Sequence, residues 1–505
     1  MTPSLHPSPL PATTRATDWS DPRRALTLLA LWLLATLGVR PLLLPDEGRY
    51  ANVARDMLHG DALVPLLNGL PFFHKPPLAY WLDMAAMWLL GVNQFSARVA
   101  PFVGAWLMGA SLFLAVRRWH GPRAALDALL LLATCPFFFI GGQYANLDML
   151  VAGLISASVL AFVRAVDDAE PARRWVVAAW TLAALAVLAK GLIGIVLPAL
   201  VVGPWLLARG RWRDVLRLLH PLGLLAFLLV ALPWLIQMQQ RYPGFFDYFV
   251  IEQHFRRYEQ TDFNNARPFW FYWVVLPLLT LPCSGWLAPA LRDAWRQRGG
   301  ADAARWALYA WWIVAVLGFF TLPTSKLPGY VLPAVAPWCL LLSVAAARFV
   351  HGVRWTAALS ALLSLALVGA LAWVAPHSAK PAATVLAAQM APGDRVVFVD
   401  EMFYDLPFYA GLKQPPIVAA DWADPELPKH DNWRKELFDA ARFDPPRGQL
   451  LLWPINRLSE LACNAPAVWF VLRPGDTARL GGVPGVEPVY ADREVQLMRA
   501  PGRGC

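Results

Sequence analysis

The chain has 505 residues, of which 57% are hydrophobic and only 16% charged, and its mean hydropathy is +0.43. These values lie outside the usual range for soluble globular domains and indicate a membrane protein. The net charge of +9 would suggest a nucleic-acid partner in a soluble protein. Here, however, the arginines gather in short loops between apolar runs, so the charge indicates membrane topology and no nucleic-acid partner is expected.

The first segment, residues 1–22, is polar and rich in proline, and is predicted to be a disordered cytoplasmic tail. The apolar run that follows is flanked by Arg23 and Arg24. It is long and no small-residue cleavage site follows it, so it is predicted to be a retained membrane anchor.

Apolar runs of about 20 residues recur along the chain, which is the length needed to cross the hydrocarbon core as a helix. They predict a polytopic α-helical membrane protein with about 11 to 13 transmembrane helices. Residues 78–91 are too short to cross and are predicted to form an interfacial helix. The expected spans lie near residues 25–44, 97–116, 123–141, 147–165, 174–190, 191–208, 215–236, 269–290, 304–322, 328–349 and 353–374.

The orientation follows from the basic loops, because cytoplasmic loops carry an excess of lysine and arginine. Eleven crossings place all of these loops on the side of the N-terminus, in the cytoplasm. The large first loop, residues 45–96, is then periplasmic, as is everything after the last span. The basic loops are residues 117–123, 164–174, 209–217, 292–305 and 348–354.

Residues 376–505 change to a mixed polar composition, and are predicted to form a small periplasmic α/β domain after a transmembrane catalytic domain at 23–375. Cys463 and Cys505 lie in this last domain, where an oxidising compartment would allow a disulfide. The strand-like runs are residues 395–399, 450–453, 467–472 and 495–498.

Non-arginine charges near membrane level gather on the predicted periplasmic side. Lys190 and Lys326 contradict the positive-inside bias, and ionisable groups at this depth are costly unless they are paired or functional. A lipid phosphate would be a suitable partner; the alternative is structural pairing with Asp148 or Glu47. The charged residues of this group are Asp46, Glu47, Lys75, Asp148, Lys190, Glu252 and Lys326.

Residues 25–375 contain a series of short motifs in a fixed order. They are Pro45-Asp-Glu-Gly-Arg-Tyr50, Val64-Pro-Leu-Leu-Asn-Gly69, Lys75-Pro-Pro77, Asn146-Leu-Asp148, Ala189-Lys-Gly191, Glu252-Gln-His254 and Ser325-Lys-Leu-Pro-Gly-Tyr330. Together these motifs resemble a known family, the GT-C glycosyltransferases. The similarity is to the bacterial type that transfers 4-amino-4-deoxy-L-arabinose from undecaprenyl phosphate to lipid A, which is related to the protein O-mannosyltransferases.

The resemblance implies a catalytic role for Asp46, with Glu47 as a second catalytic candidate and Arg49 beside them. It implies that further residues bind the phosphate of the donor or form carboxylate–cation pairs there. These are Lys75, Asp148, Lys326 and Tyr330. Arg49 and Lys190 are also predicted to bind the donor phosphate or another part of the substrate, and the loop arginines Arg256, Arg257 and Arg267 join them because their aromatic neighbours suit a lipid headgroup. An ordinary interfacial belt is the alternative for the arginines.

One position departs from the family pattern, because His74 stands where these enzymes usually have glutamate before the lysine. His74 and His254 are two candidate ligands for a divalent metal ion, although solvated loop histidines are the alternative. No cofactor is required by the expected chemistry, since the donor already carries its leaving group and the chain has no nucleotide-binding motif.

The sequence therefore predicts a glycosyltransferase of the bacterial inner membrane with its active site facing the periplasm. The expected partners are an undecaprenyl-phosphate sugar, lipid A or another envelope acceptor, and membrane lipids. A protein O-mannosyltransferase-like enzyme, a polyprenyl-glycolipid transporter or flippase, and a non-catalytic scaffold remain alternatives. The sugar, the acceptor and the oligomeric state stay open.

Overall fold

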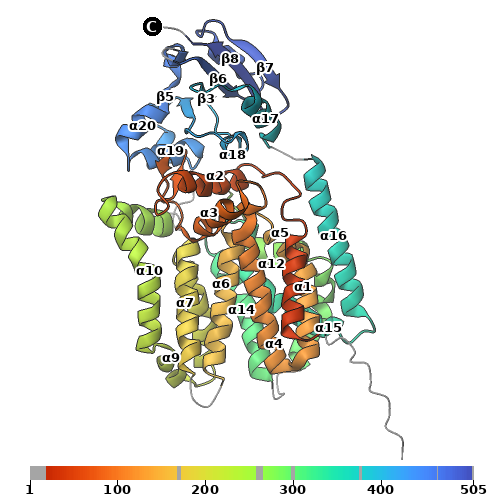
Figure 1. The fold of residues 1–505 in the computed structure, drawn as a ribbon. Coiled ribbons are helices and arrows are strands. Elements are labelled where there is room, and N and C mark those ends of the chain that lie inside the picture. Colours follow the sequence, from red (N-terminus) through yellow and green to blue (C-terminus); the bar gives the residue numbers. More distant parts are fainter. Residues whose placement is uncertain are drawn as a thin grey trace, which may run out of the picture.

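The computed structural model describes residues 19–167, 172–256, 265–296, 302–374, 378–462 and 465–502. A helical bundle forms one part, and a smaller domain with a β-sheet sits on one end of it (Figure 1). Residues 1–18 of the predicted disordered tail lie outside the described residues, as do Cys463 and Cys505 of the predicted disulfide.

The bundle is arranged around α6 (Asp148–Ala165), 94% of which is buried, whereas α10 (Pro221–Arg241) and α16 (Gly352–Val374) are 22% buried and lie at the periphery. Their composition explains the difference, since α10 and α16 expose leucines that suit a lipid environment. The other helices of the bundle are α1 (Pro22–Leu34), α4 (Val99–Thr134), α5 (Pro136–Gly141), α7 (Arg173–Lys190), α8 (Ile193–Leu207), α9 (Trp212–Leu218), α12 (Phe271–Leu279), α13 (Leu287–Arg296), α14 (Ala303–Thr321) and α15 (Val335–Ala346). The π-helix η2 (Asp247–Arg256) and the 3-10 helices η1 (Ser96–Arg98), η3 (Cys283–Trp286) and η5 (Pro328–Ala334) accompany them.

Every expected span contains helix, although the first one, residues 25–44, is helical only as far as Leu34, and fewer helices than expected meet the length and composition of a membrane span. In the described part of the chain six do so, or seven if the pair α12 and α13, bent by 107°, counts as one. The expected number was 11 to 13. The difference arises because α1 and α8 have only 13 and 15 residues, α7 carries three charges, and α4 contains two expected spans joined at Gly121.

The first loop folds into a cap over one end of the bundle. It contains α2 (Asp46–His59), a two-stranded hairpin of β1 (Leu66–Leu67) and β2 (Leu70–Pro71), and α3 (Leu78–Leu90). Helix α3 forms where the short interfacial helix was predicted. Helices α2 and α3 lie between the bundle and the C-terminal domain (Figure 1).

The C-terminal domain is a six-stranded sheet in the order β5-β4-β3-β6-β8-β7, parallel from β5 to β6 and antiparallel beyond. Strands β3 and β6 have the predicted bounds, and all six residues of β6 are buried because both faces of the sheet are covered. The elements are α17 (Lys380–Gln389), β3 (Arg395–Val399), α18 (Leu406–Ala410), β4 (Ile417–Ala420), η6 (Leu427–Lys429), α19 (Trp433–Ala441), α20 (Pro445–Leu451), β5 (Leu452–Pro454), η7 (Ile455–Ala462), β6 (Ala467–Leu472), η8 (Asp476–Leu480), β7 (Glu487–Ala491) and β8 (Gln496–Pro501).

The cap and the C-terminal domain share one hydrophobic core, which includes Val53 and Met57 from the cap and Phe398 and Leu437 from the domain. Hydrogen bonds also cross this boundary. Asn68 Nδ2 donates to the carbonyl of Pro416 at 2.9 Å. The domain is therefore packed firmly on the first loop.

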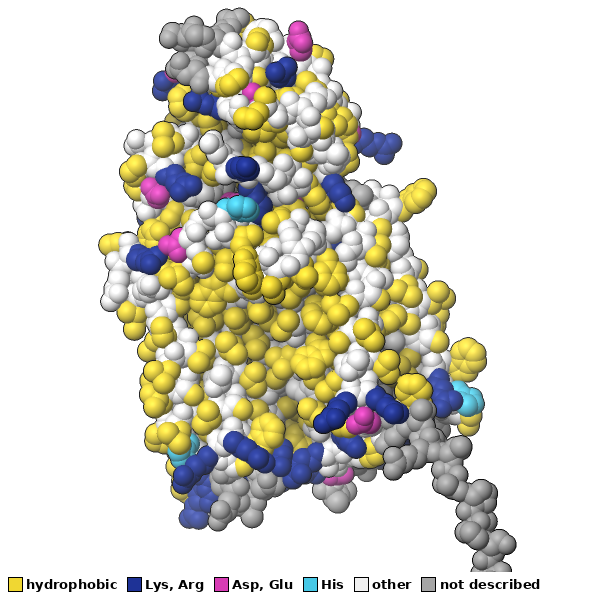
Figure 2. All heavy atoms as spheres, in the orientation of Figure 1, with side chains coloured by type: hydrophobic (Ala, Val, Ile, Leu, Met, Phe, Trp, Pro, Cys, Tyr) yellow, Lys and Arg dark blue, Asp and Glu magenta, His cyan; other side chains and the backbone are white. Residues whose placement is uncertain are grey.

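Side-chain charge divides the surface of the bundle into zones. On the face shown in Figure 2, hydrophobic side chains form a broad band over the bundle, and lysines and arginines gather at the end opposite the C-terminal domain. Helix α9, which overlaps the basic loop at residues 209–217, lies at this basic end (Figure 1). Such a distribution is typical of a multi-pass membrane protein.

Candidate active site

The candidate site begins where the chain leaves the bundle and enters α2. Asp46 and Glu47 occupy the first turn of α2, where the positive end of the helix dipole favours carboxylates. One turn on, Arg49 Nη2 donates to Asp46 Oδ1 at 2.5 Å. The Asp46 side chain remains 35% exposed, so a substrate can reach it.

Arg49 has a second carboxylate partner from the C-terminal domain. Its Nη1 forms an ion pair with Oε1 of Glu436 on α19. Tyr404 donates its hydroxyl hydrogen to the other oxygen of Glu436 at 2.7 Å. The C-terminal domain therefore contributes Glu436, which binds the arginine that is paired with Asp46.

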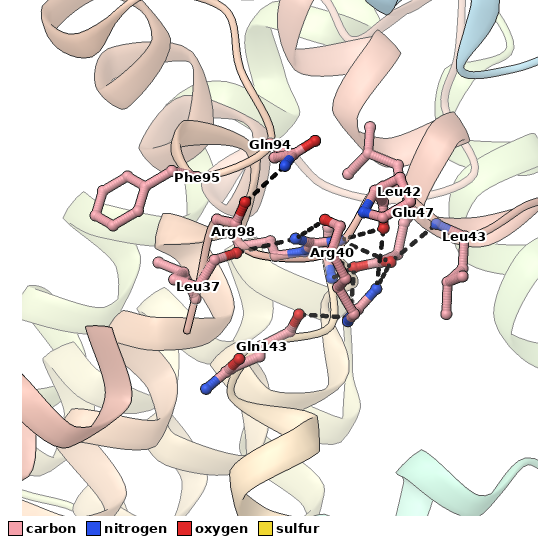
Figure 3. Close-up of polar contacts among 12 residues, drawn as sticks. Leu37, Arg40, Leu42, Leu43, Glu47, Gln94, Phe95, Arg98 and Gln143 are labelled. Atoms are coloured by element: carbon pink, nitrogen blue, oxygen red, sulfur yellow. Dashed lines mark hydrogen bonds and ion pairs between the residues drawn. The ribbon is translucent and has the colours of Figure 1, made fainter. Parts of the chain in front are cut away.

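Glu47 lies in a different environment from its neighbour Asp46, because its side chain is fully buried between Arg40 and Arg98. Figure 3 shows both guanidinium groups converging on it. Arg98 Nε donates to Glu47 Oε1 at 2.9 Å, and both Arg40 and Arg98 make a second bond to the carboxylate. Backbone N–H groups of Leu43 and Ala145 donate to it as well, at 3.0 and 2.8 Å.

This network determines the charge and the accessibility of Glu47. Burial alone would raise the pKa of Glu47, but the charges and hydrogen bonds of Arg98 and Arg40 outweigh it and lower this pKa to about 2. Both carboxylate oxygens are already occupied by protein donors. The catalytic role that the sequence predicted for Glu47 therefore does not fit its position, because no substrate can reach it here.

A second charged group lies at the start of α6 and the end of α7. Lys190 forms an ion pair with Asp148, and Lys190 Nζ lies 4.5 Å from the centre of the Tyr330 ring. Gly329 allows this approach, since a Cβ atom there would lie 2.2 Å from Asp148 Oδ2. The sequence left two interpretations of Lys190 open, binding of a lipid phosphate and pairing with a carboxylate of the protein. The observed contact is the pairing with Asp148.

The two charged groups are connected by the short loop between α5 and α6. Ala145 binds Glu47 through its N–H, and Asn146 Oδ1 accepts a hydrogen bond from the N–H of Asp148 at 2.9 Å. Arg40 lies over the ring of Tyr144, 5.8 Å from its centre. Contacts through this loop therefore connect three of the predicted residues. Asp46 is joined through its neighbour Glu47, and Asp148 and Lys190 are joined through Asn146.

Lys326 is buried in the loop before η5 and is not part of either group. Its Nζ donates to the carbonyls of Arg267 and Pro323, the former at 3.1 Å. Lys75 is half-buried immediately before α3. The predicted phosphate-binding role of both lysines stays a prediction.

The predicted metal ligands are only partly described. His74 is buried and stacked on Phe72, with ring centres 4.5 Å apart. The side chains of His254 and Arg256 are not described, and Arg257 lies outside the described residues. Within the described ranges, no group of three or more histidine, cysteine or acidic side chains is placed to hold a metal ion.

Sequence analysis missed four residues of this site: Arg40, Arg98, Tyr404 and Glu436. A signal for Arg40 was present, because it interrupts an apolar run on the side where arginine is unexpected. Glu436 gave no such signal, since an acidic residue in a polar domain is ordinary. Its partner Arg49 is 387 positions away along the chain.

Comparison with known proteins supports the class that fold and site define. The structure of ArnT from Cupriavidus metallidurans bound to undecaprenyl phosphate superposes with a TM-score of 0.82 at 24% identity, covering 94% of this chain and 97% of that one. The family model for dolichyl-phosphate-mannose-protein mannosyltransferase matches residues 74–236. The chain is thus a multi-pass helical membrane protein with the GT-C fold.

Sequence relatives narrow this class further. The undecaprenyl phosphate-α-4-amino-4-deoxy-L-arabinose arabinosyl transferase of Pseudomonas aeruginosa is 36% identical over 362 residues, 69% of this chain and 64% of that protein. The Erwinia tasmaniensis transferase of the same name is 34% identical over 331 residues, 64% of this chain and 58% of its own length. The chain is a homologue of the aminoarabinose transferases, which confirms the resemblance seen in the motifs, and the matches span about three fifths of these relatives.

Proposed function

We propose that this protein transfers 4-amino-4-deoxy-L-arabinose from undecaprenyl phosphate to lipid A at the periplasmic face of the inner membrane. The observation that carries the proposal is the accessible Asp46, paired with Arg49 at the start of α2, in a homologue of the aminoarabinose transferases. Asp46 is the first residue of α2, which lies at the end of the bundle next to the C-terminal domain (Figure 1), opposite the basic end (Figure 2). By the positive-inside rule this is the periplasmic end.

In the proposed reaction an oxygen of the acceptor attacks the anomeric carbon of the sugar. The bond from that carbon to the phosphate oxygen breaks, and undecaprenyl phosphate leaves with the electron pair. Lys75, Lys326 and the loop arginines are the candidates that stabilise the phosphate charge. Asp46 orients the acceptor and accepts its proton if the acceptor is a hydroxyl.

A phosphate acceptor changes the role of Asp46, because a phosphate oxygen is already anionic and needs no base. Asp46 then binds the amino group of the sugar and holds the donor. Glu47 does not contact substrate in either version. It positions the start of α2 through Arg40 and Arg98.

The proposal assigns no step to a metal ion. A cofactor-independent reaction stays a prediction that metal removal can test. Dialysis against a chelator should leave transfer activity unchanged, and restoration of lost activity by a divalent ion would contradict it.

The decisive experiment uses the full chain in nanodiscs with undecaprenyl-phosphate aminoarabinose and lipid A, with products read by mass spectrometry. The wild type should add the sugar to lipid A, and Asp46→Ala should lower kcat by at least about a hundred-fold. Asp61→Ala is the matched control, since Asp61 lies in the same loop but pairs with Arg241 on the exposed surface. Undiminished transfer by Asp46→Ala would refute the assignment.

Other outcomes separate the alternatives. Donor turnover with no product on lipid A would direct the search to another acceptor, including a protein, in keeping with the mannosyltransferase family model. Absence of any donor turnover would favour a transporter.

A further inference from the structure

Arg49 is shared between two carboxylates that come from distant parts of the chain. Nη2 binds Asp46 on the same helix, and Nη1 binds Glu436 on α19. The Asp46 side chain is 35% exposed, whereas that of Glu436 is 8% exposed. The accessible carboxylate faces substrate, and the enclosed one is available only to the protein.

Glu436 is itself held in a single orientation. It lies in the first turn of α19. Asn432 caps the start of this helix, because its side chain accepts hydrogen bonds from the N–H groups of Arg434 and Lys435 at 3.0 and 3.1 Å. Tyr404 occupies its second oxygen at 2.7 Å. Both oxygens of Glu436 therefore have fixed partners, and the Arg49 fork cannot rotate freely.

The guanidinium of Arg49 is also confined by aromatic rings. Its Cζ lies 5.2 Å from the ring centre of Tyr50 and 5.8 Å from that of Tyr404. The two terminal nitrogens of Arg49 bind different carboxylates, Nη1 that of Glu436 and Nη2 that of Asp46. An arginine fork can bind one carboxylate with two parallel N–H groups, and the contact of Nη1 with Glu436 keeps the two terminal nitrogens from pairing with Asp46 together.

We propose that Glu436 of the C-terminal domain is a positioning residue for the transfer reaction, which holds Arg49 so that Asp46 keeps its exposed oxygen. The inference rests on the proposed function. Without Glu436, Nη1 of Arg49 loses its carboxylate partner, and the guanidinium can turn both terminal N–H groups onto Asp46 and occupy the oxygen that is open to a substrate.

The test compares Glu436→Gln with wild type in the nanodisc assay. We expect kcat, per amount of folded protein, to fall on the order of ten- to a hundred-fold with a smaller change in KM, as for a misplaced catalytic group. Glu436→Asp should recover part of kcat, because it restores a carboxylate partner for Arg49. Tyr404→Phe, which removes the hydrogen bond to the second oxygen of Glu436, should lower kcat by less.

Glu460→Gln is the matched control, because Glu460 lies in the same domain and is paired with Arg457 on the exposed surface. A kcat of Glu436→Gln equal to that of wild type, per amount of folded protein, would overturn the proposal. If Glu436→Gln does not yield folded protein, Tyr404→Phe decides by the same criterion. Transfer of the sugar to lipid A by the wild type in the same assay tests the proposed function separately, so that its failure is distinguishable from failure of this proposal.

Discussion

Glu47 and Asp46 are adjacent in the chain, yet their side chains meet opposite environments. Replacing Glu47 with Gln would leave Arg40 and Arg98 buried without a compensating charge. We expect a loss of about 3–5 kcal/mol in the free energy of unfolding, measured by chemical unfolding of the detergent-solubilised protein. Glu426→Gln, which alters an exposed pair with Lys429, is the control and should change stability little.

The pH dependence of this contribution has a definite sign. The pKa of Glu47 in the folded protein, about 2, lies below its ordinary value of 4.5. Its stabilisation is therefore complete above about pH 4.5 and is lost as pH falls towards 2. Equal acid sensitivity of wild type and Glu47→Gln in this range would contradict the prediction.

The carboxyl group of Asp405 makes the opposite contribution to the pH dependence of stability. It accepts hydrogen bonds from Ser378 Oγ and the N–H of Ala379, both at 3.0 Å, but burial raises its pKa to about 7. Because this value exceeds the ordinary 3.8, the folded state binds more protons and stability falls as pH rises from about 4 to 7. Asp405→Asn should flatten the dependence of Tm on pH in that window, whereas the exposed control Asp421→Asn should not.

At the scale of secondary-structure elements, the crossing of α4 and α6 depends on glycine. A Cβ atom on Gly153 would lie 2.0 Å from the carbonyl oxygen of Gly104, so the two helices would have to separate. Gly153→Ala should cost about 1–3 kcal/mol, detected as a lower Tm. Gly369→Ala on α16, where a Cβ atom meets open space, should not lower Tm, since alanine is also the better helix former, and an equal loss in both variants would disprove the close-crossing argument.

For the whole molecule, the proposed orientation can be tested by cysteine labelling. In a background of Cys463→Ser and Cys505→Ser, Glu426→Cys should react with a membrane-impermeant maleimide once the outer membrane is permeabilised. Arg123→Cys at the basic end should react only after the inner membrane is broken. The opposite pattern would place the active site in the cytoplasm and rule out the proposed acceptor.

The amino-acid sequence by itself determined the features that depend on local patterns. Apolar runs and flanking arginines predicted the helices and the basic end, and alternation with turn residues predicted β3 and β6 at their observed bounds. The first-loop motif also predicted a catalytic role for Asp46, because the order of the motif residues is itself a property of the sequence, and that role stays a prediction.

Only the tertiary structure decided which charges meet. Glu47 faces Arg98 across 51 positions, and Arg49 faces Glu436 across 387. Periodicity reports the environment of a segment but carries no information about which distant segment packs against it. The burial of Glu47 and the contribution of the C-terminal domain to the site therefore follow from packing, because a carboxylate becomes structural or accessible according to the side chains that enclose it.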